Sequence, residues 1–159
     1  MRITQKAVAT LAAAVSFTGI AVLNCDTATA AVPVTLSFQV QSDDTNLDEY
    51  LGSDVLTRDP SLGYQNWTVT PLDDGSVTIK GTHYGKCIAT NGPGKNVTQK
   101  PCSQNDLAQR WFLDLTSDTT VIESAKSPEF VLQANGPDRT VTTEYALAAQ
   151  NQQWTAYQK

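Results

Sequence analysis

The chain has 159 residues, 40% of them hydrophobic and 17% charged, which is the composition of one globular domain and not of a disordered or collagen-like chain. Sixteen acidic residues against eleven basic ones give a net charge of −5, so nucleic acid and anionic membranes are poor partners, since both attract positive charge. The single histidine, His83, excludes most histidine-rich metal sites, and we expect neither a metal nor a cofactor.

Residues 1–30 have the pattern of a secretory signal peptide. Arg2 and Lys6 precede a stretch without charge, and Ala28-Thr29-Ala30 is a small-x-small cleavage site. A membrane anchor is the first alternative, although the apolar run is short and has no basic flank. A lipoprotein attached through Cys25 is the second, although the residue before it is not small. We expect a secreted, extracellular protein without a membrane partner.

Removal of residues 1–30 leaves a domain over 31–159 with two cysteines, Cys87 and Cys102. It also removes two basic residues and one acidic residue, so the net charge becomes −6. An even pair of cysteines in an exported chain indicates a disulfide. The alternative is two reduced thiols in the core.

The three tryptophans of the chain mark an internal repeat. Each has a glutamine two positions earlier, and the tryptophans are 44 and 43 residues apart. The pairs are Gln65 with Trp67, Gln109 with Trp111, and Gln152 with Trp154. A repeat of this size is typical of architectures in which neighbouring units share one core.

Shorter motifs recur at an offset of 44. Asn91-Gly92-Pro93 returns as Asn135-Gly136-Pro137, and Asp74, Ser76 and Val77 align with Asp118, Thr120 and Val121. We therefore divide the domain into repeats of about 31–72, 73–115 and 116–159.

The repeating unit is predicted to be all-β. Short segments rich in β-branched and aromatic residues follow in chain order at Val34–Val40, Ser76–Lys80, Glu129–Gln133 and Thr140–Tyr145. Turn residues bound them, and no segment keeps a helical period. About four strands per repeat give about twelve in all. Three such units can close round a pseudo-threefold axis, with the tryptophans in the shared core and the glutamine amides satisfying backbone groups beside them.

The three Gln-x-Trp motifs, with the cysteine pair inside repeat two, resemble the ricin B-type (R-type) lectins across the whole domain. The resemblance implies a β-trefoil with three pseudo-symmetric repeats and a non-catalytic function in binding a carbohydrate or glycoconjugate, with galactose- or xylose-type sugars as the family-level expectation. A family site combines an acid two residues after the first cysteine position, an aromatic just before the second, and an asparagine before the glutamine.

Carried onto repeat two, the family pattern finds no site chemistry. The acid position is Ala89, the aromatic position falls near Lys100, and the asparagine position is Ala108. We expect repeat two to bind no sugar.

Repeat three is the best candidate for ligand binding. Gln133 stands at the acid position, Tyr145 in the aromatic region, and Asn151 directly before Gln152. These amides and the ring can supply a polar fork and a stacking surface for a sugar. The alternative is that Gln133 and Asn151 complete hydrogen bonds at strand ends and that Tyr145 is a rim residue.

Repeat one aligns loosely. Glu49 stands at the acid position, Arg58 near the aromatic one, and Tyr64 in place of the asparagine, with Tyr50 close by. This arrangement fits a sugar or a cation, and it fits a solvated loop as well.

The sequence offers little for catalysis or calcium. No nucleophile or metalloprotease signature occurs, and the acidic stretch from Asp43 to Glu49 lacks the spacing of a calcium loop. We expect no enzyme. The rival functions are a secreted trefoil that binds a protein target, such as a protease inhibitor, and a structural domain without ligand.

Overall fold

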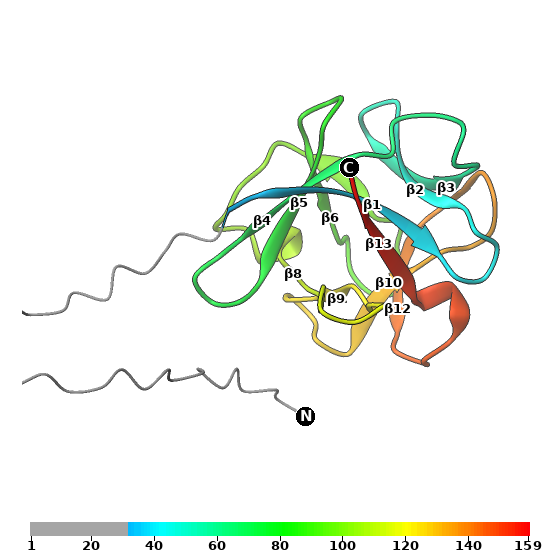
Figure 1. Ribbon diagram of the computed structural model, residues 1–159. Coiled ribbons are helices and arrows are strands. Elements are labelled where there is room, and N and C mark those ends of the chain that lie inside the picture. Colours follow the sequence, from blue (N-terminus) through cyan, green and yellow to red (C-terminus); the bar gives the residue numbers. More distant parts are fainter. Residues whose placement is uncertain (1–31) are drawn as a thin grey trace, which may run out of the picture.

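The computed structural model describes residues 32–159, so the expected signal peptide lies outside the described residues. The described chain forms thirteen strands and two short 3-10 helices, which confirms the all-β prediction of about twelve strands (Figure 1). The strands are β1 Val34–Val40, β2 Asn46–Tyr50, β3 Asp54–Arg58, β4 Trp67–Pro71, β5 Val77–Gly81, β6 Cys87–Ala89, β7 Thr98–Lys100, β8 Trp111–Phe112, β9 Glu123–Ser124, β10 Phe130–Gln133, β11 Arg139–Thr140, β12 Thr142–Tyr145 and β13 Trp154–Gln158. The helices are η1 Leu107–Gln109 and η2 Gln150–Gln152.

One expected strand is divided in two. The segment Thr140–Tyr145 breaks at Val141, between β11 and β12. The Val141 side chain is fully buried, and its N–H donates to the Val55 carbonyl 2.9 Å away on another repeat. Val141 therefore joins two repeats, and this contact interrupts the strand.

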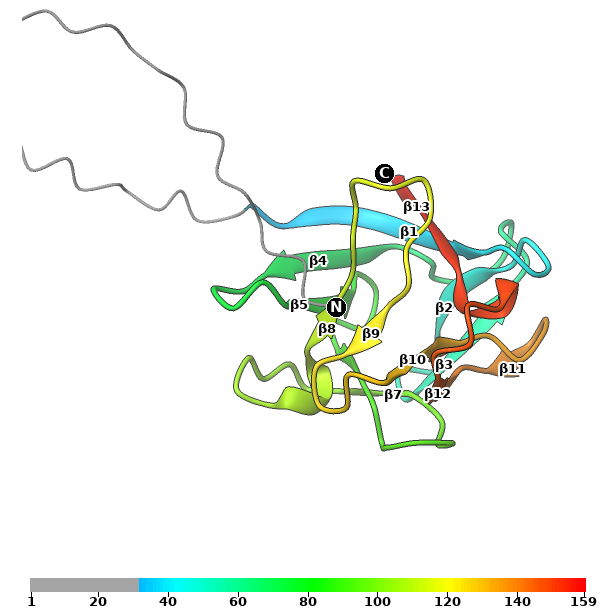
Figure 2. The same cartoon turned by 90° about the horizontal axis from the view of Figure 1, so that it is seen from below.

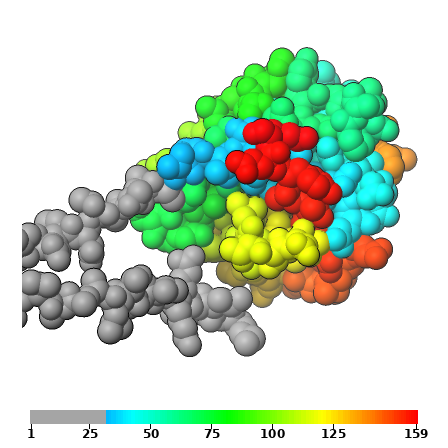
Figure 3. Space-filling view, viewed as in Figure 1, coloured from blue at the N-terminus to red at the C-terminus, as the bar shows by residue number. Residues whose placement is uncertain are grey.

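The strands form one antiparallel network that joins the beginning of the domain to its end. β1 pairs with β13 from Leu36 opposite Gln158 to Val40 opposite Trp154. The two strands lie side by side in both ribbon views (Figures 1 and 2). The space-filling view shows the C-terminal residues on the surface against β1 (Figure 3). Among residues 32–159, no helix has the length and apolar character of a membrane span.

The three tryptophans occupy equivalent places in the core. Each ring is fully buried, and each indole Nε1–H donates to a main-chain carbonyl of the first hairpin in its own repeat. These bonds are Trp67 to Leu47 at 3.0 Å, Trp111 to Ile88 at 3.2 Å, and Trp154 to Leu132 at 3.2 Å. The bonds define Leu47, Ile88 and Leu132 as equivalent positions under the pseudo-threefold symmetry.

The strand pairing corrects one of the sequence alignments. Trp67 pairs with Gly81, and Trp111 pairs with Ser124, so the offset after the tryptophan is 43 and not 44. The equivalent of the buried Ile79 is therefore the buried Ile122. The expected match of Val77 with Val121 is wrong by one residue, because the β8–β9 connection is one residue shorter than its counterpart between β4 and β5.

The two cysteines of the domain are bonded to each other. Cys87 on β6 and Cys102, two residues beyond β7, form a disulfide with a Cα–Cα distance of 5.0 Å. The bond closes the hairpin of repeat two.

Candidate functional site

The glutamine of each Gln-x-Trp motif closes the hairpin of its repeat from within. All three side chains are buried, and each Nε2 donates to a carbonyl on the far side of the hairpin. The acceptors are Asp59 for Gln65 at 2.8 Å, Pro101 for Gln109 at 3.0 Å, and Tyr145 for Gln152 at 2.8 Å. The buried amide thereby has a partner of its own and ties the two sides of the hairpin together.

These bonds correct the assignment of Gln152 to ligand contact. The side chain is only 1% exposed, and its Nε2 also donates to Gln133 Oε1 at 2.9 Å. Its Oε1 accepts the N–H of Leu147 at 2.8 Å. Gln152 therefore positions Gln133 from beneath the surface and does not reach a ligand.

The hairpin register identifies the acid position in every repeat. Asp48 pairs with Leu56, Ala89 with Thr98, and Gln133 with Thr142. Asp48, Ala89 and Gln133 each directly follow the residue whose carbonyl accepts the indole N–H in that repeat. Asp48, Ala89 and Gln133 are thus equivalent.

Glu49 is not at the acid position of repeat one, because it lies one residue further on. Its N–H donates to the Tyr64 carbonyl, as the N–H of Thr90 does to Ala108 and that of Ala134 to Asn151. The expected acid position in repeat one was therefore wrong by one residue, and Asp48 occupies it.

Repeat three brings Gln133 and Asn151 together. Both side chains are half-buried, at the end of β10 and within η2. The Asn151 Nδ2 donates to the carbonyl of Ala134, the residue after Gln133, at 3.1 Å. Gln133 Nε2 donates to Asn135 Oδ1 at 3.2 Å. The result is a group of amides with fixed orientation at the surface of one hairpin.

Tyr145 does not face that amide group. It pairs with Phe130 across the hairpin, and the two ring centroids are 4.3 Å apart. Gln133 lies three residues from Phe130 on the same strand, and an odd separation places two side chains on opposite faces. The ring is 62% exposed, so it forms the rim of the hairpin on the side away from Gln133.

Repeat two has no polar group at either site position. Ala89 and Ala108 are both buried. The Lys100 Nζ donates to Asn91 Oδ1 at 2.9 Å, which directs this side chain toward the neighbouring turn. Repeat two therefore presents two buried alanine methyl groups at the positions where repeat three has Gln133 and Asn151.

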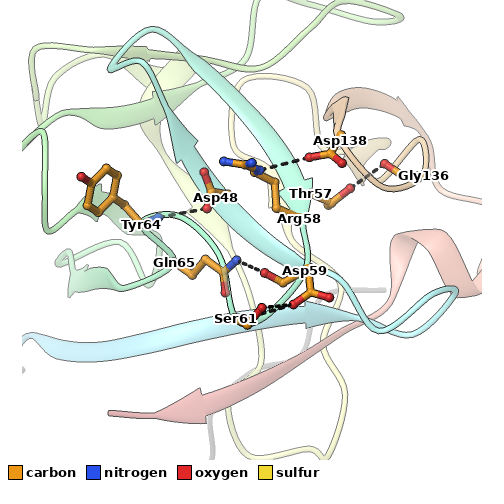
Figure 4. A network of polar contacts seen from close by, with 9 residues as sticks. All are labelled: Asp48, Thr57, Arg58, Asp59, Ser61, Tyr64, Gln65, Gly136 and Asp138. Carbon is orange, nitrogen blue, oxygen red and sulfur yellow. Dashed lines mark hydrogen bonds and ion pairs between the residues drawn. The ribbon is translucent and has the colours of Figure 1, made fainter.

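In repeat one the carboxyl group of Asp48 is covered. Its Oδ2 accepts the N–H of Tyr64 at 3.0 Å, and only 1% of the residue is exposed (Figure 4). Gly63 lies directly over it, at a φ of 72° that few residues other than glycine adopt, and a Cβ there would collide with the carboxylate. Burial raises the pKa of Asp48, and the nearby positive charge of Arg58 lowers it in part.

Glu49 organises a cluster of aromatic rings beside Asp48. The buried carboxylate accepts the main-chain N–H groups of His83 at 2.9 Å and Tyr84 at 3.1 Å. The His83 ring stacks on Tyr64 with centroids 3.5 Å apart, and Tyr84 meets both rings edge-on. The cluster is therefore preorganised by a buried acid that the other repeats lack.

The sequence analysis missed Asp48 and this cluster. The triplets Asn46-Leu47-Asp48, Cys87-Ile88-Ala89 and Val131-Leu132-Gln133 share an apolar central residue, and aligning those central residues identifies Asp48. No periodic signal marks His83 or Tyr84, because their loop contacts Glu49 across 34 and 35 residues of chain.

A family model described as ricin-type beta-trefoil lectin domain-like matches residues 63–147, more than half of the chain. The chain belongs to this family. No curated protein matches its sequence.

Solved structures of β-trefoil proteins resemble the domain. The designed threefold-symmetric protein ThreeFoil is 22% identical with a TM-score of 0.71, over 79% of this chain and 99% of that one. The Macrolepiota procera ricin B-like lectin, solved with lactose, is 15% identical with a TM-score of 0.66, over 79% and 95%. The C-half of the earthworm R-type lectin, solved with GalNAc, is 14% identical with a TM-score of 0.62, over 79% and 99%. At these identities the likeness shows the fold.

Proposed function

We propose that the chain is a secreted, non-catalytic protein that binds carbohydrate through the amide group of repeat three. Gln133 and Asn151 carry the proposal. An amide presents a donor and an acceptor side by side, which is the pair that neighbouring hydroxyls of a sugar require. Membership of the lectin family and the sugars bound by the earthworm and Macrolepiota proteins support carbohydrate as the ligand class.

The arrangement of the group fits selective binding. Gln152 holds the Gln133 amide, and the backbone of Ala134 holds Asn151, so little conformational entropy is lost when a sugar binds. Tyr145 lies on the other side of the hairpin and is not expected to stack on a ligand that contacts both amides. The two amides form a single site, so we expect weak affinity for a single sugar.

A glycan array with the purified protein tests the proposal. We expect binding to galactose- or xylose-type glycans, loss of binding in Gln133→Ala and in Asn151→Ala, and unchanged binding in Tyr145→Ala. Lys100→Ala is the matched control on the hairpin of repeat two. Mass spectrometry of the bound glycan should find it intact, as expected for a protein that is not an enzyme.

Two outcomes would contradict the proposal. Binding that survives both amide substitutions would remove repeat three as the site. Absence of binding to every glycan, together with inhibition in a panel of proteases, would favour the alternative of a trefoil that binds proteins.

A further inference from the structure

The dipeptide Asn-Gly occurs twice in the chain, each time in the turn of a hairpin. Asn91-Gly92 lies between β6 and β7 of repeat two, and Asn135-Gly136 lies between β10 and β11 of repeat three. Both asparagines are exposed. An asparagine side-chain amide before glycine can react with the main-chain nitrogen of that glycine, because glycine has no side chain to obstruct the approach.

The two asparagine side chains are held in the same way. Each Nδ2 donates to the carbonyl five residues ahead and to the threonine hydroxyl seven residues ahead. The distances are 2.8 and 2.9 Å for Asn91, and 2.8 and 3.1 Å for Asn135. The two turns therefore do not differ in how they anchor the amide nitrogen that the reaction would release.

The two glycine N–H groups do differ. The Gly92 N–H donates to Thr90 Oγ1 at 3.0 Å. Ala134 takes the place of Thr90 in repeat three and has no hydroxyl, and the Gly136 N–H has no hydrogen-bond partner among residues 32–159. The glycine nitrogen must lose its proton and turn toward the asparagine Cγ to react, and a hydrogen bond through that proton opposes both changes. Gly136 is therefore the less hindered nucleophile.

We propose that Asn135 is a site of spontaneous deamidation and that the Thr90 hydroxyl protects Asn91 from the same reaction. The Gly136 nitrogen loses its proton to solvent and bonds to Asn135 Cγ, the Cγ–Nδ2 bond breaks, and the amide nitrogen leaves as ammonia after taking a proton from water. Water then opens the resulting succinimide ring at either carbonyl. The products are aspartate and isoaspartate, and nothing is oxidised or reduced.

The modification falls beside the amide group of repeat three. Asn135 Oδ1 accepts from Gln133 Nε2 at 3.2 Å, and the Asn135 Nδ2 joins the two sides of the turn. The carboxylate product has no N–H, so both bonds across the turn are lost, and isoaspartate also lengthens the main chain next to Gln133. We expect weaker sugar binding after deamidation. This consequence rests on the proposed function, whereas the modification does not.

Mass spectrometry of proteolytic peptides tests the proposal, after the folded protein has been incubated at mildly alkaline pH. We expect aspartate and isoaspartate to accumulate faster at Asn135 than at Asn91. In the protein denatured by urea the two sites should react equally fast, because both have the sequence Asn-Gly-Pro. Faster or equal reaction at Asn91 in the folded protein, or no product at Asn135 while the denatured chain reacts, overturns the proposal.

A substitution in repeat two tests the protecting bond within one turn. Thr90→Ala should speed deamidation of Asn91 about tenfold, the factor that corresponds to one hydrogen bond of ordinary strength, and Thr90→Ser should leave the rate unchanged. The Lys100 Nζ, which donates to Asn91 Oδ1 at 2.9 Å, is present in both variants and cancels. The fold should tolerate Thr90→Ala, because Thr143 Oγ1 keeps its bond to the Gly92 carbonyl. An unchanged rate in Thr90→Ala overturns the role of Thr90.

The glycan array separates this modification from the proposed function. Sugar binding should decrease in proportion to the fraction of Asn135 converted, and Asn135→Asp should also bind more weakly than the natural protein. Binding that is unaffected by conversion overturns the consequence for Gln133. Deamidation is scored by mass spectrometry alone, so failure of all sugar binding overturns the proposed function and leaves the comparison of Asn135 with Asn91 intact.

Discussion

Repeat two closes its hairpin with the Cys87–Cys102 disulfide and has alanine at both site positions. Repeat one has no crosslink there and buries two acids, Asp48 and Glu49. The indole bond to the hairpin carbonyl is nevertheless the same in both repeats, and so is the glutamine bond that closes the hairpin.

The comparison shows which parts of the fold are shared and which are free to differ. The tryptophan and glutamine bonds stabilise each repeat from the core in the same way, so the residues at the outer end of the hairpin can differ between repeats. Repeat two has a disulfide at this end of the hairpin. Repeat one has buried carboxylates, stacked aromatic rings and a pocket there.

The largest expected effect on stability comes from removing a core tryptophan, which all three repeats share. Trp111→Ala removes a fully buried ring and its indole hydrogen bond, and we expect a loss of about 3–5 kcal/mol in the free energy of unfolding. Urea denaturation followed by circular dichroism measures it. Phe112→Ala, at a partly exposed neighbour, should cost far less. Equal losses in the two variants would show that the tryptophans do not form the shared core.

The next largest effect on stability comes from removing the disulfide, which only repeat two has among the described residues. Cys87→Ser combined with Cys102→Ser should lower the free energy of unfolding by about 3 kcal/mol, since the disulfide closes a loop with a sequence separation of 15. Chemical denaturation with and without a reducing agent measures this. The reductant should destabilise the natural protein and leave the double variant unchanged. A natural protein insensitive to the reductant would contradict the stabilising role of the bond.

A smaller effect on stability comes from neutralising the buried carboxylate of Glu49, which has no counterpart at the equivalent positions of the other two repeats. Glu49→Gln retains one acceptor but turns an NH₂ group toward a main-chain N–H, at a cost of about 1.5–3 kcal/mol in unfolding free energy. Hydrogen exchange should speed up at the amides of His83 and Tyr84. The half-buried Glu144→Gln on β12 is the control and should leave those amides unchanged. Unaltered exchange in Glu49→Gln would mean that the carboxylate does not hold the aromatic cluster.

The smallest effect is a pH dependence of repeat one. Burial raises the pKa of Asp48, so the folded protein keeps this proton to a higher pH than the unfolded chain does. The contribution of Asp48 to stability is therefore lost as the pH rises from the usual aspartate pKa through the raised one. Asp48→Asn should gain stability relative to the natural protein over that range.

Unfolding free energies of both proteins across the pH range measure the difference. Glu123, whose pKa is also raised by burial, is present in both and cancels. A difference that does not vary with pH would contradict the raised pKa of Asp48.

The positions of Gln133 and Asn151 could be predicted from the sequence, whereas the acid position of repeat one was missed because its loops differ in length. Counting along the chain worked in repeats two and three, where 23 and 22 residues separate the indole donor from its acceptor. In repeat one the separation is 20, so the offsets that hold in repeats two and three do not lead from Trp67 to Leu47 and Asp48. Strand pairing decides which residues are equivalent, and a change in loop length alters the count without altering the pairing.

The sequence by itself determined the fold and its period, because burial in a shared core requires large apolar side chains at equivalent places in all three repeats. Trp67, Trp111 and Trp154 are these side chains, and their spacing is visible in the sequence. Only the tertiary structure decided which polar groups reach the surface: Gln152 lies beneath it, Gly63 covers Asp48, and Tyr145 faces away from Gln133. The loops that cover or expose these groups do not repeat, and their paths depend on contacts between residues distant in the chain.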